Sequence, residues 1–209
     1  MFAPPQQKSN SPPPEQIQLI AIYPNNVISQ NFTSGKDANC SFPKPNIIKH
    51  DDIQQTIVVF SREINSGVWE FVGRVRKQKY DMGIGIIDGK KTVIPHPFIY
   101  QSNKDNNTIF YIKQNVYIKG AGLYSLGNQL IKQGDEITAI VDLTSNPKSF
   151  CLKINSVLQP FCVISVPERV KFILYFSNKD EEWEFVSLKE VAEAQNLSHI
   201  HPSNRHNYK

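Results

Sequence analysis

The sequence predicts an all-β protein in which two antiparallel sheets pack face to face as a sandwich. Short runs rich in Ile, Val, Phe and Tyr recur across residues 17–186. Many of these runs alternate apolar with polar side chains, which is the period of a half-buried strand. Clusters of Asn, Asp, Gly, Ser and Lys separate the runs as turns. No helix-length periodic stretch interrupts this pattern, and a segment of this length is enough for one sizeable core.

The first strands are justified by which side chains share a face. Residues 57–60 form a continuous apolar run. In the strand that begins at Val68, Trp69, Phe71 and Val75 fall on one face, while charged residues fall on the other. We therefore assign Trp69 to the core.

The later strands follow the same alternation. We expect them at 137–143, 150–155 and 170–176, with a further one around Trp183 and Phe185. The Asp88-Gly89 pair predicts a type I′ hairpin that joins residues 84–87 to residues 92–94. Glycines inside strand runs, such as Gly83 and Gly85, indicate bulges or close backbone packing.

The two ends of the chain have a different composition. Residues 1–16 hold five prolines among Gln, Ser and Asn, which predicts a disordered tail. Ser187-Leu188-Lys189-Glu190 matches a capping box and predicts a short helix over 188–196, followed by a polar tail. The expected organisation is a Pro-rich tail at 1–16, a sandwich domain at 17–186 and a helix with a polar tail at 187–209.

Composition narrows the class of protein. Lys and Arg number 23 against 19 Asp and Glu, so the net charge of +4 is low for a nucleic-acid-binding protein. No apolar stretch is long enough to span a membrane, and no secretory signal is evident. Three sparse cysteines do not make a disulfide framework. We expect a protein of the cytoplasm or nucleus that has no membrane partner.

No motif for catalysis or metal binding stands out. The cysteines lack Cys-x-x-Cys spacing, and the sequence contains no Gly-x-Ser-x-Gly elbow. The Asp180–Glu184 acidic run is expected to be a solvated loop rim, and no pair of carboxylates lies on one inward strand face. His50 precedes Asp51 and Asp52 in an expected polar loop, where the acids favour its charged form. We therefore expect no cofactor, no metal and no enzyme.

Five segments follow one another in a characteristic order. They are Gly67-Val68-Trp69-Glu70-Phe71, Asp81-Met82-Gly83-Ile84, Gly134–Leu143, Ser149–Ser156 and Arg169–Phe176. In order and spacing they resemble the strands of SPRY domains, a family with the concanavalin A-like β-sandwich fold. Val68 and the Asn155-Ser156 turn depart from the family's usual residues, so the chain resembles a divergent, stand-alone member.

The resemblance implies a non-catalytic module that binds a protein or peptide through loops at one edge of the sandwich. A rigid scaffold that carries variable loops fits this function, and Tyr suits rigid amphipathic contact. We expect a monomer that binds a protein or peptide ligand. The expected contact residues are Arg76, Tyr80, Tyr117, Tyr124, Asn178 and Asp180.

Two alternatives remain open from the sequence. A carbohydrate-binding sandwich would use the Asn-rich loop at 103–107. Weak nucleic-acid binding would use the basic loop from Arg74 to Lys79, although the low net charge makes nucleic acid the less favoured partner.

Overall fold

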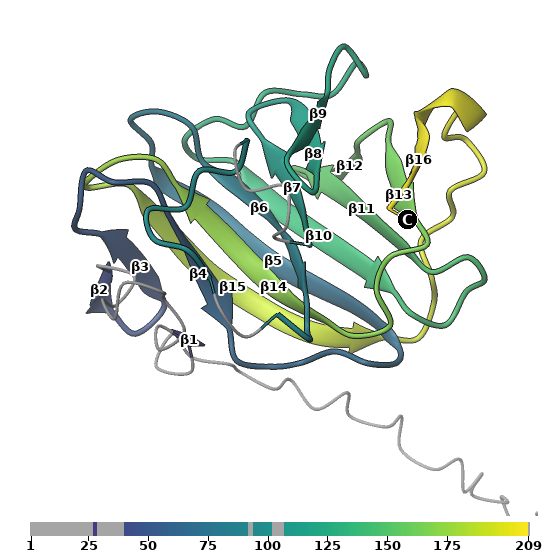
Figure 1. The fold of residues 1–209 in the computed structure, drawn as a ribbon, viewed down its shortest axis with the longest axis horizontal. Coiled ribbons are helices and arrows are strands. Elements are labelled where there is room, and N and C mark those ends of the chain that lie inside the picture. The colour runs from purple at the N-terminus through teal and green to yellow at the C-terminus, as the bar shows by residue number, and fades with distance from the viewer. Residues whose placement is uncertain (1–26, 29–39, 92–93, 102–106, 209) are drawn as a thin grey trace, which may run out of the picture.

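A computed structural model describes residues 27–28, 40–91, 94–101 and 107–208, which form two sheets packed face to face (Figure 1). The predicted tail at 1–16 lies outside the described residues. The strands are β1 (Val27–Ile28), β2 (Cys40–Lys44), β3 (Ile47–His50), β4 (Thr56–Phe60), β5 (Val68–Lys77), β6 (Gly83–Asp88), β7 (Thr108–Ile112), β8 (Asn115–Ile118), β9 (Ala121–Leu123), β10 (Glu136–Asp142), β11 (Ser149–Ile154), β12 (Val157–Leu158), β13 (Cys162–Ile164), β14 (Val170–Phe176), β15 (Glu182–Val191) and β16 (Arg205–Asn207).

The strand order confirms the predicted two-sheet, all-β fold. The seven-stranded sheet has the order β1-β4-β14-β6-β7-β8-β9. The nine-stranded sheet has the order β16-β13-β11-β10-β5-β15-β3-β2, with β12 paired to β11. The described strand pairs are antiparallel except for β13 and β16, which run parallel.

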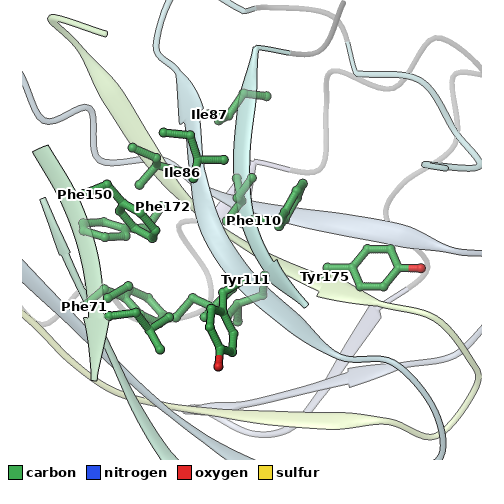
Figure 2. Packing of buried hydrophobic residues seen from close by; sticks show 14 of the residues in the cluster. Phe71, Ile86, Ile87, Phe110, Tyr111, Phe150, Phe172 and Tyr175 are labelled. Atoms are coloured by element: carbon green, nitrogen blue, oxygen red, sulfur yellow. The ribbon is translucent and has the colours of Figure 1, made fainter. Parts of the chain in front are cut away.

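The main core lies between the sheets, as alternation predicts. Trp69 is buried, and the Phe71 ring stacks on Phe172 of the other sheet with centroids 5.4 Å apart. Figure 2 shows Phe71 and Phe172 on one side of the seven-stranded sheet and Phe110 and Tyr175 on the other. The second side is buried as well, because Phe98 of the 94–101 segment packs on Phe110 there.

The predicted hairpin at Asp88-Gly89 is wrong. β6 pairs with β7 on one side and with β14 on the other. The amide of Lys91 donates to the Asp88 carbonyl at 2.9 Å, so a turn does form there. Both edges of β6 are thus taken by strands other than the predicted partner, of which residues 92 and 93 lie outside the described residues.

Glycines within β6 allow close backbone packing, as expected. A Cβ on Gly85 would lie 1.9 Å from the Ile109 carbonyl oxygen of β7. A side chain there would separate the two strands.

The predicted C-terminal helix at 188–196 is also wrong. β15 runs through Val191 and pairs with β5 along its length, with an irregular register between Phe185 and Ser187. This bulge inserts one residue, so the buried side chains Phe185 and Leu188 are three apart instead of two. A spacing of three imitates a helix in the sequence.

The last residues belong to the sandwich and do not form the predicted polar tail. After β15 the chain crosses the nine-stranded sheet and forms a three-residue 3₁₀ turn at Pro202–Asn204 before β16. Ile200 and Tyr208 are buried. The domain boundary predicted at residue 186 falls inside β15. No helix in the described part of the chain is long and apolar enough to cross a membrane.

Candidate functional site

One end of the sandwich gathers the loops that carry most of the predicted contact residues. The antiparallel order brings together five connections, which we call the loop end: residues 51–55, 78–82, 124–135, 155–156 and 177–181. Four of the eight exposed large apolar side chains found in the described residues lie in these loops, namely Ile53, Tyr80, Tyr124 and Leu130. A fifth, Val157, directly follows the 155–156 turn.

A buried carboxylate joins two of these loops. The Glu181 side chain is fully buried and accepts hydrogen bonds from the amides of Ser177 at 2.8 Å and Asn178 at 3.0 Å. It also accepts one from the amide of Tyr80 at 2.9 Å, across to the 78–82 loop. Three amides facing one carboxylate fix both loops at once.

Asp180 is the neighbour of Glu181, and two lysines of the same chain balance its charge. Its carboxylate pairs with Lys49 at 3.1 Å and with Lys79 at 3.2 Å. Hydrogen bonds and charge from these two lysines lower the pKa of Asp180 to about 2. Asp180 therefore stays ionised, and its charge holds the loop in place.

His50 is buried next to Asp180 and Glu181. Its amide donates to the Glu181 carbonyl at 3.0 Å, and its carbonyl accepts from the Asp180 amide at 2.7 Å. The ring Nδ1 donates to the Asn178 carbonyl at 2.8 Å. Burial lowers the pKa of His50. The expectation of a polar loop and a favoured charged form is thus wrong, because desolvation outweighs the neighbouring acids.

Two glutamines extend the connections to the 124–135 loop. Gln78 donates through Nε2 to the Tyr80 carbonyl at 3.0 Å, and its amide donates to Gln133 Oε1 at 3.2 Å. The buried Gln159 accepts from the Gln129 amide at 2.7 Å. Glu181 and Gln78 thereby join the loops 177–181, 78–82 and 124–135, and Gln159 ties Gln129 to the chain just after β12.

The predicted tyrosines divide into exposed and buried ones. Tyr80 and Tyr124 are 62% and 58% exposed. Tyr117, on β8, is buried, which contradicts its predicted role as a direct contact. Its ring lies 4.6 Å from Tyr100 and 6.1 Å from Tyr124, centroid to centroid. The buried ring of Tyr117 therefore packs against the exposed ring of Tyr124.

A polar cavity opens beside Tyr124. It has a volume of about 360 Å³ and is lined by Gln114, Asn115, Asn128 and the 124–127 stretch. The Asn128 side chain donates to the Gln114 carbonyl at 3.1 Å, which ties this wall to the β7–β8 turn.

The predicted basic loop is mostly strand. Arg74, Arg76 and Lys77 belong to β5. Arg74 pairs with Glu136 at 2.8 Å and Arg76 with Glu184 at 3.6 Å, so carboxylates on neighbouring strands balance both arginines. Arg76 is half-exposed on the sheet and is not part of a loop.

Sequence reasoning missed the three linking side chains. Glu181 was assigned to a solvated acidic rim, yet it is buried. Its spacing of two and four residues from Trp183 and Phe185, both inward-facing, was the available signal. Gln78 and Gln159 carry no comparable signal, because loop contacts depend on the whole topology. Within the described residues, no group of three or more His, Cys, Asp and Glu side chains could hold a metal ion.

Comparison with known proteins confirms the sequence resemblance at the level of the fold. The SPRY domain of human HERC1 has 14% identity and a TM-score of 0.55, covering 75% of this chain and 95% of that one. The PSpry domain of TRIM65 has 9% identity and a TM-score of 0.50, covering 75% and 94%. Carbohydrate-binding module CBM66 from Bacillus subtilis has 12% identity and a TM-score of 0.42, covering 69% and 86%. No protein-family model and no curated protein matches the sequence. The chain has a SPRY-like β-sandwich fold.

Proposed function

We propose that this chain is a non-catalytic binding module whose protein or peptide partner contacts the loop end. The observation that carries the proposal is the gathering of exposed Ile53, Tyr80, Tyr124 and Leu130 at one end of the sandwich. Grouped exposed apolar side chains rimmed by polar ones are typical of interaction surfaces. The fold supports the same function, since the SPRY resemblance implies loop-mediated recognition of a protein.

Rigidity of the loop end supports a preformed surface. Glu181 and Gln78 tie three loops together through backbone groups, so little conformational entropy remains to be lost on binding. Tyr80 and Tyr124 then offer large amphipathic side chains with few rotatable bonds. A partner that buries both rings is expected to gain most of its affinity there.

The alternatives have less support in the described residues. Most of the Asn-rich loop suggested for carbohydrate, residues 102–106, lies outside them. The arginines suggested for nucleic acid are already paired with Glu136 and Glu184. Both alternatives are separate outcomes of the test below.

The test compares partner capture by the full chain, a Tyr80→Ala/Tyr124→Ala variant and a matched Val186→Ala control. Val186 is an exposed apolar side chain on β15, outside the loop end. Bound proteins are identified by mass spectrometry with and without nuclease and high salt, and the three proteins are also applied to a glycan array. The dissociation constant for any captured partner is then measured with purified components.

A nuclease-resistant partner that the control retains and the double variant binds roughly 30-fold or more weakly would support the proposal. Equal binding by the double variant would place the site elsewhere. Capture that nuclease abolishes would indicate nucleic acid instead. Specific glycan binding would favour the carbohydrate alternative.

A further inference from the structure

Two of the three cysteines lie on neighbouring strands of the nine-stranded sheet, Cys151 on β11 and Cys162 on β13. β11 pairs with β13 so that Ser149 faces Ile164 and Phe150 faces Val163. Continuing this antiparallel register by one residue places Cys151 opposite Cys162. Phe150 and Val163 point into the main core, so both cysteines lie on the outer face of the nine-stranded sheet.

This placement suits a covalent bridge. Directly opposed side chains of an antiparallel pair have Cβ atoms about 4.5–5.5 Å apart. A disulfide requires about 3.5–4.5 Å between Cβ atoms, so a small inward shift of the two strands is enough. The third cysteine, Cys40, lies on β2 at the opposite edge of the same sheet and is out of reach.

The C-terminal part of the chain covers the cysteine pair. Cys151 packs with Val68 and Ile140 beneath the partly buried Val191 and Leu197. Cys162 lies beside Arg205, because β16 pairs with β13 there. Both thiols are consequently buried, and neither forms a disulfide.

The covering segment, residues 192–204, is held by few contacts. Leu197 and Ile200 supply its apolar anchors, while Arg205 donates to their carbonyl oxygens at 3.0 and 3.2 Å. Asn204 donates to the Pro160 carbonyl at 2.7 Å. Apart from its 3₁₀ turn at Pro202–Asn204 the segment has no regular structure. Segments of this kind open locally at a lower free energy than the strands beneath them.

A cavity bordered by the segment reaches a neighbour of Cys151. Its volume is about 540 Å³, and its lining includes Glu70, Ile140, Lys153 and the stretch 191–196. Ile140 is the direct cross-strand neighbour of Cys151 on β10. The cavity therefore ends one side chain away from the thiol.

We propose that Cys151 and Cys162 form a reversible redox-modification site, in which a cross-strand disulfide forms when segment 192–204 opens. The oxidant class is a small-molecule disulfide such as glutathione disulfide. One cysteine thiolate attacks it, forms a mixed disulfide and releases one thiol. The second cysteine thiolate then attacks the protein-bound sulfur and releases the other thiol. The protein gives up two protons and two electrons, and one disulfide is exchanged for another.

Burial explains why the closed form resists this reaction. Loss of solvation raises the pKa of Cys162 to about 11 and raises that of Cys151 as well. Only the thiolate is nucleophilic, so the covered pair is unreactive and opening of the segment controls the rate.

The test incubates the full chain in glutathione buffers of increasing oxidation and maps the disulfides by mass spectrometry of non-reduced peptides. Cys40→Ala is the matched control, since it keeps the pair and removes the distant thiol. Both this variant and the natural sequence are expected to yield the Cys151–Cys162 peptide, and reduction is expected to reverse it. A Leu197→Ala variant, which loses one anchor of the covering segment, is expected to oxidise roughly tenfold faster.

Three results would overturn the proposal. The first is oxidation that yields only glutathionylated single cysteines or bridges between molecules through Cys40. The second is a Cys151–Cys162 bridge that appears only in denaturant. The third is an oxidation rate in Leu197→Ala equal to that of the natural sequence, which would remove the role of the covering segment.

Discussion

At the scale of single residues, the loop end depends on one buried glutamate side chain. Glu181 is fully buried, and three backbone amides from two loops donate to it. Hydrogen bonds to a charged group are stronger than those between neutral groups, and their loss leaves buried donors without an equal partner. The side chain thus stabilises the site without contacting a partner.

Glu181→Gln should lower the free energy of unfolding by about 1.5–3 kcal/mol, because a neutral amide replaces the charged acceptor of three amides. Urea unfolding of the purified chain measures this change. Glu182→Gln, at the neighbouring half-buried position, is the matched control and should stay within about 0.5 kcal/mol. Equal losses in the two variants would contradict the assigned role of Glu181.

His50 predicts how the stability of this site responds to pH. Burial lowers its folded-state pKa below the ordinary value of 6.5, so the folded protein favours the neutral ring. The unfolded chain binds the proton more readily, and stability is therefore full above pH 6.5 and falls as the pH drops toward the folded-state pKa.

The measurement is the free energy of unfolding against pH for the natural sequence and for His50→Gln, which should show a weaker fall below pH 6.5. His206 also has a pKa lowered by burial, so a His206→Gln variant separates its contribution. An unchanged pH profile in His50→Gln would show that His50 does not cause the fall.

Only part of the site could be predicted from the sequence, because the identity of a residue does not show which distant segments pack around it. Tyr80, Asn178 and Asp180 could be placed in loops because polar segments between apolar strands are visible in the sequence. Their contact with a partner stays a prediction. Tyr117 was placed outside, although it packs between Tyr100 and Tyr124. Its burial comes from strands and loops distant along the chain, which no local pattern encodes.

At the scale of elements, alternation predicted strands well wherever the two-residue period is unbroken. β5 and β14 show the expected faces. β15 does not, because its bulge near Val186 shifts the inward phase by one residue. The capping-box pattern at Ser187 then favoured a helix, yet backbone pairing with β5 and the burial of Leu188 outweigh that local preference.

Leu188→Ala distinguishes the strand from a surface helix. Leu188 is buried opposite Phe71, so its truncation should lower the free energy of unfolding by about 2–4 kcal/mol. Val186→Ala, at the exposed bulge position, should cost less than about 1 kcal/mol. Thermal or urea unfolding measures both, and similar small losses would argue against the observed inward phase.

At the scale of the whole molecule, the two sheets could be predicted because many short strands with turn-like connections have few ways to bury their apolar faces. The boundary at residue 186 could not be predicted correctly, because the last residues are mostly polar and only a few apolar side chains among them pack on the sheet. Ile200 and Tyr208 are buried, and β16 pairs with β13. A few apolar side chains among polar ones are enough to dock a segment on an existing sheet.

Truncation tests how the last residues contribute to the domain. A chain ending at residue 186 loses half of β15, including Leu188, and should not unfold cooperatively. A chain ending at Val191 keeps all of β15 and loses only the covering segment and β16, so it should still fold, with a lower free energy of unfolding.

Because Cys151 and Cys162 would then lack their cover, a thiol reagent should label both in the chain ending at Val191 much faster than in the full chain. Slow labelling of that chain would show that segment 192–204 does not protect the thiols, and cooperative unfolding of the chain ending at 186 would show that Leu188 is dispensable to the core.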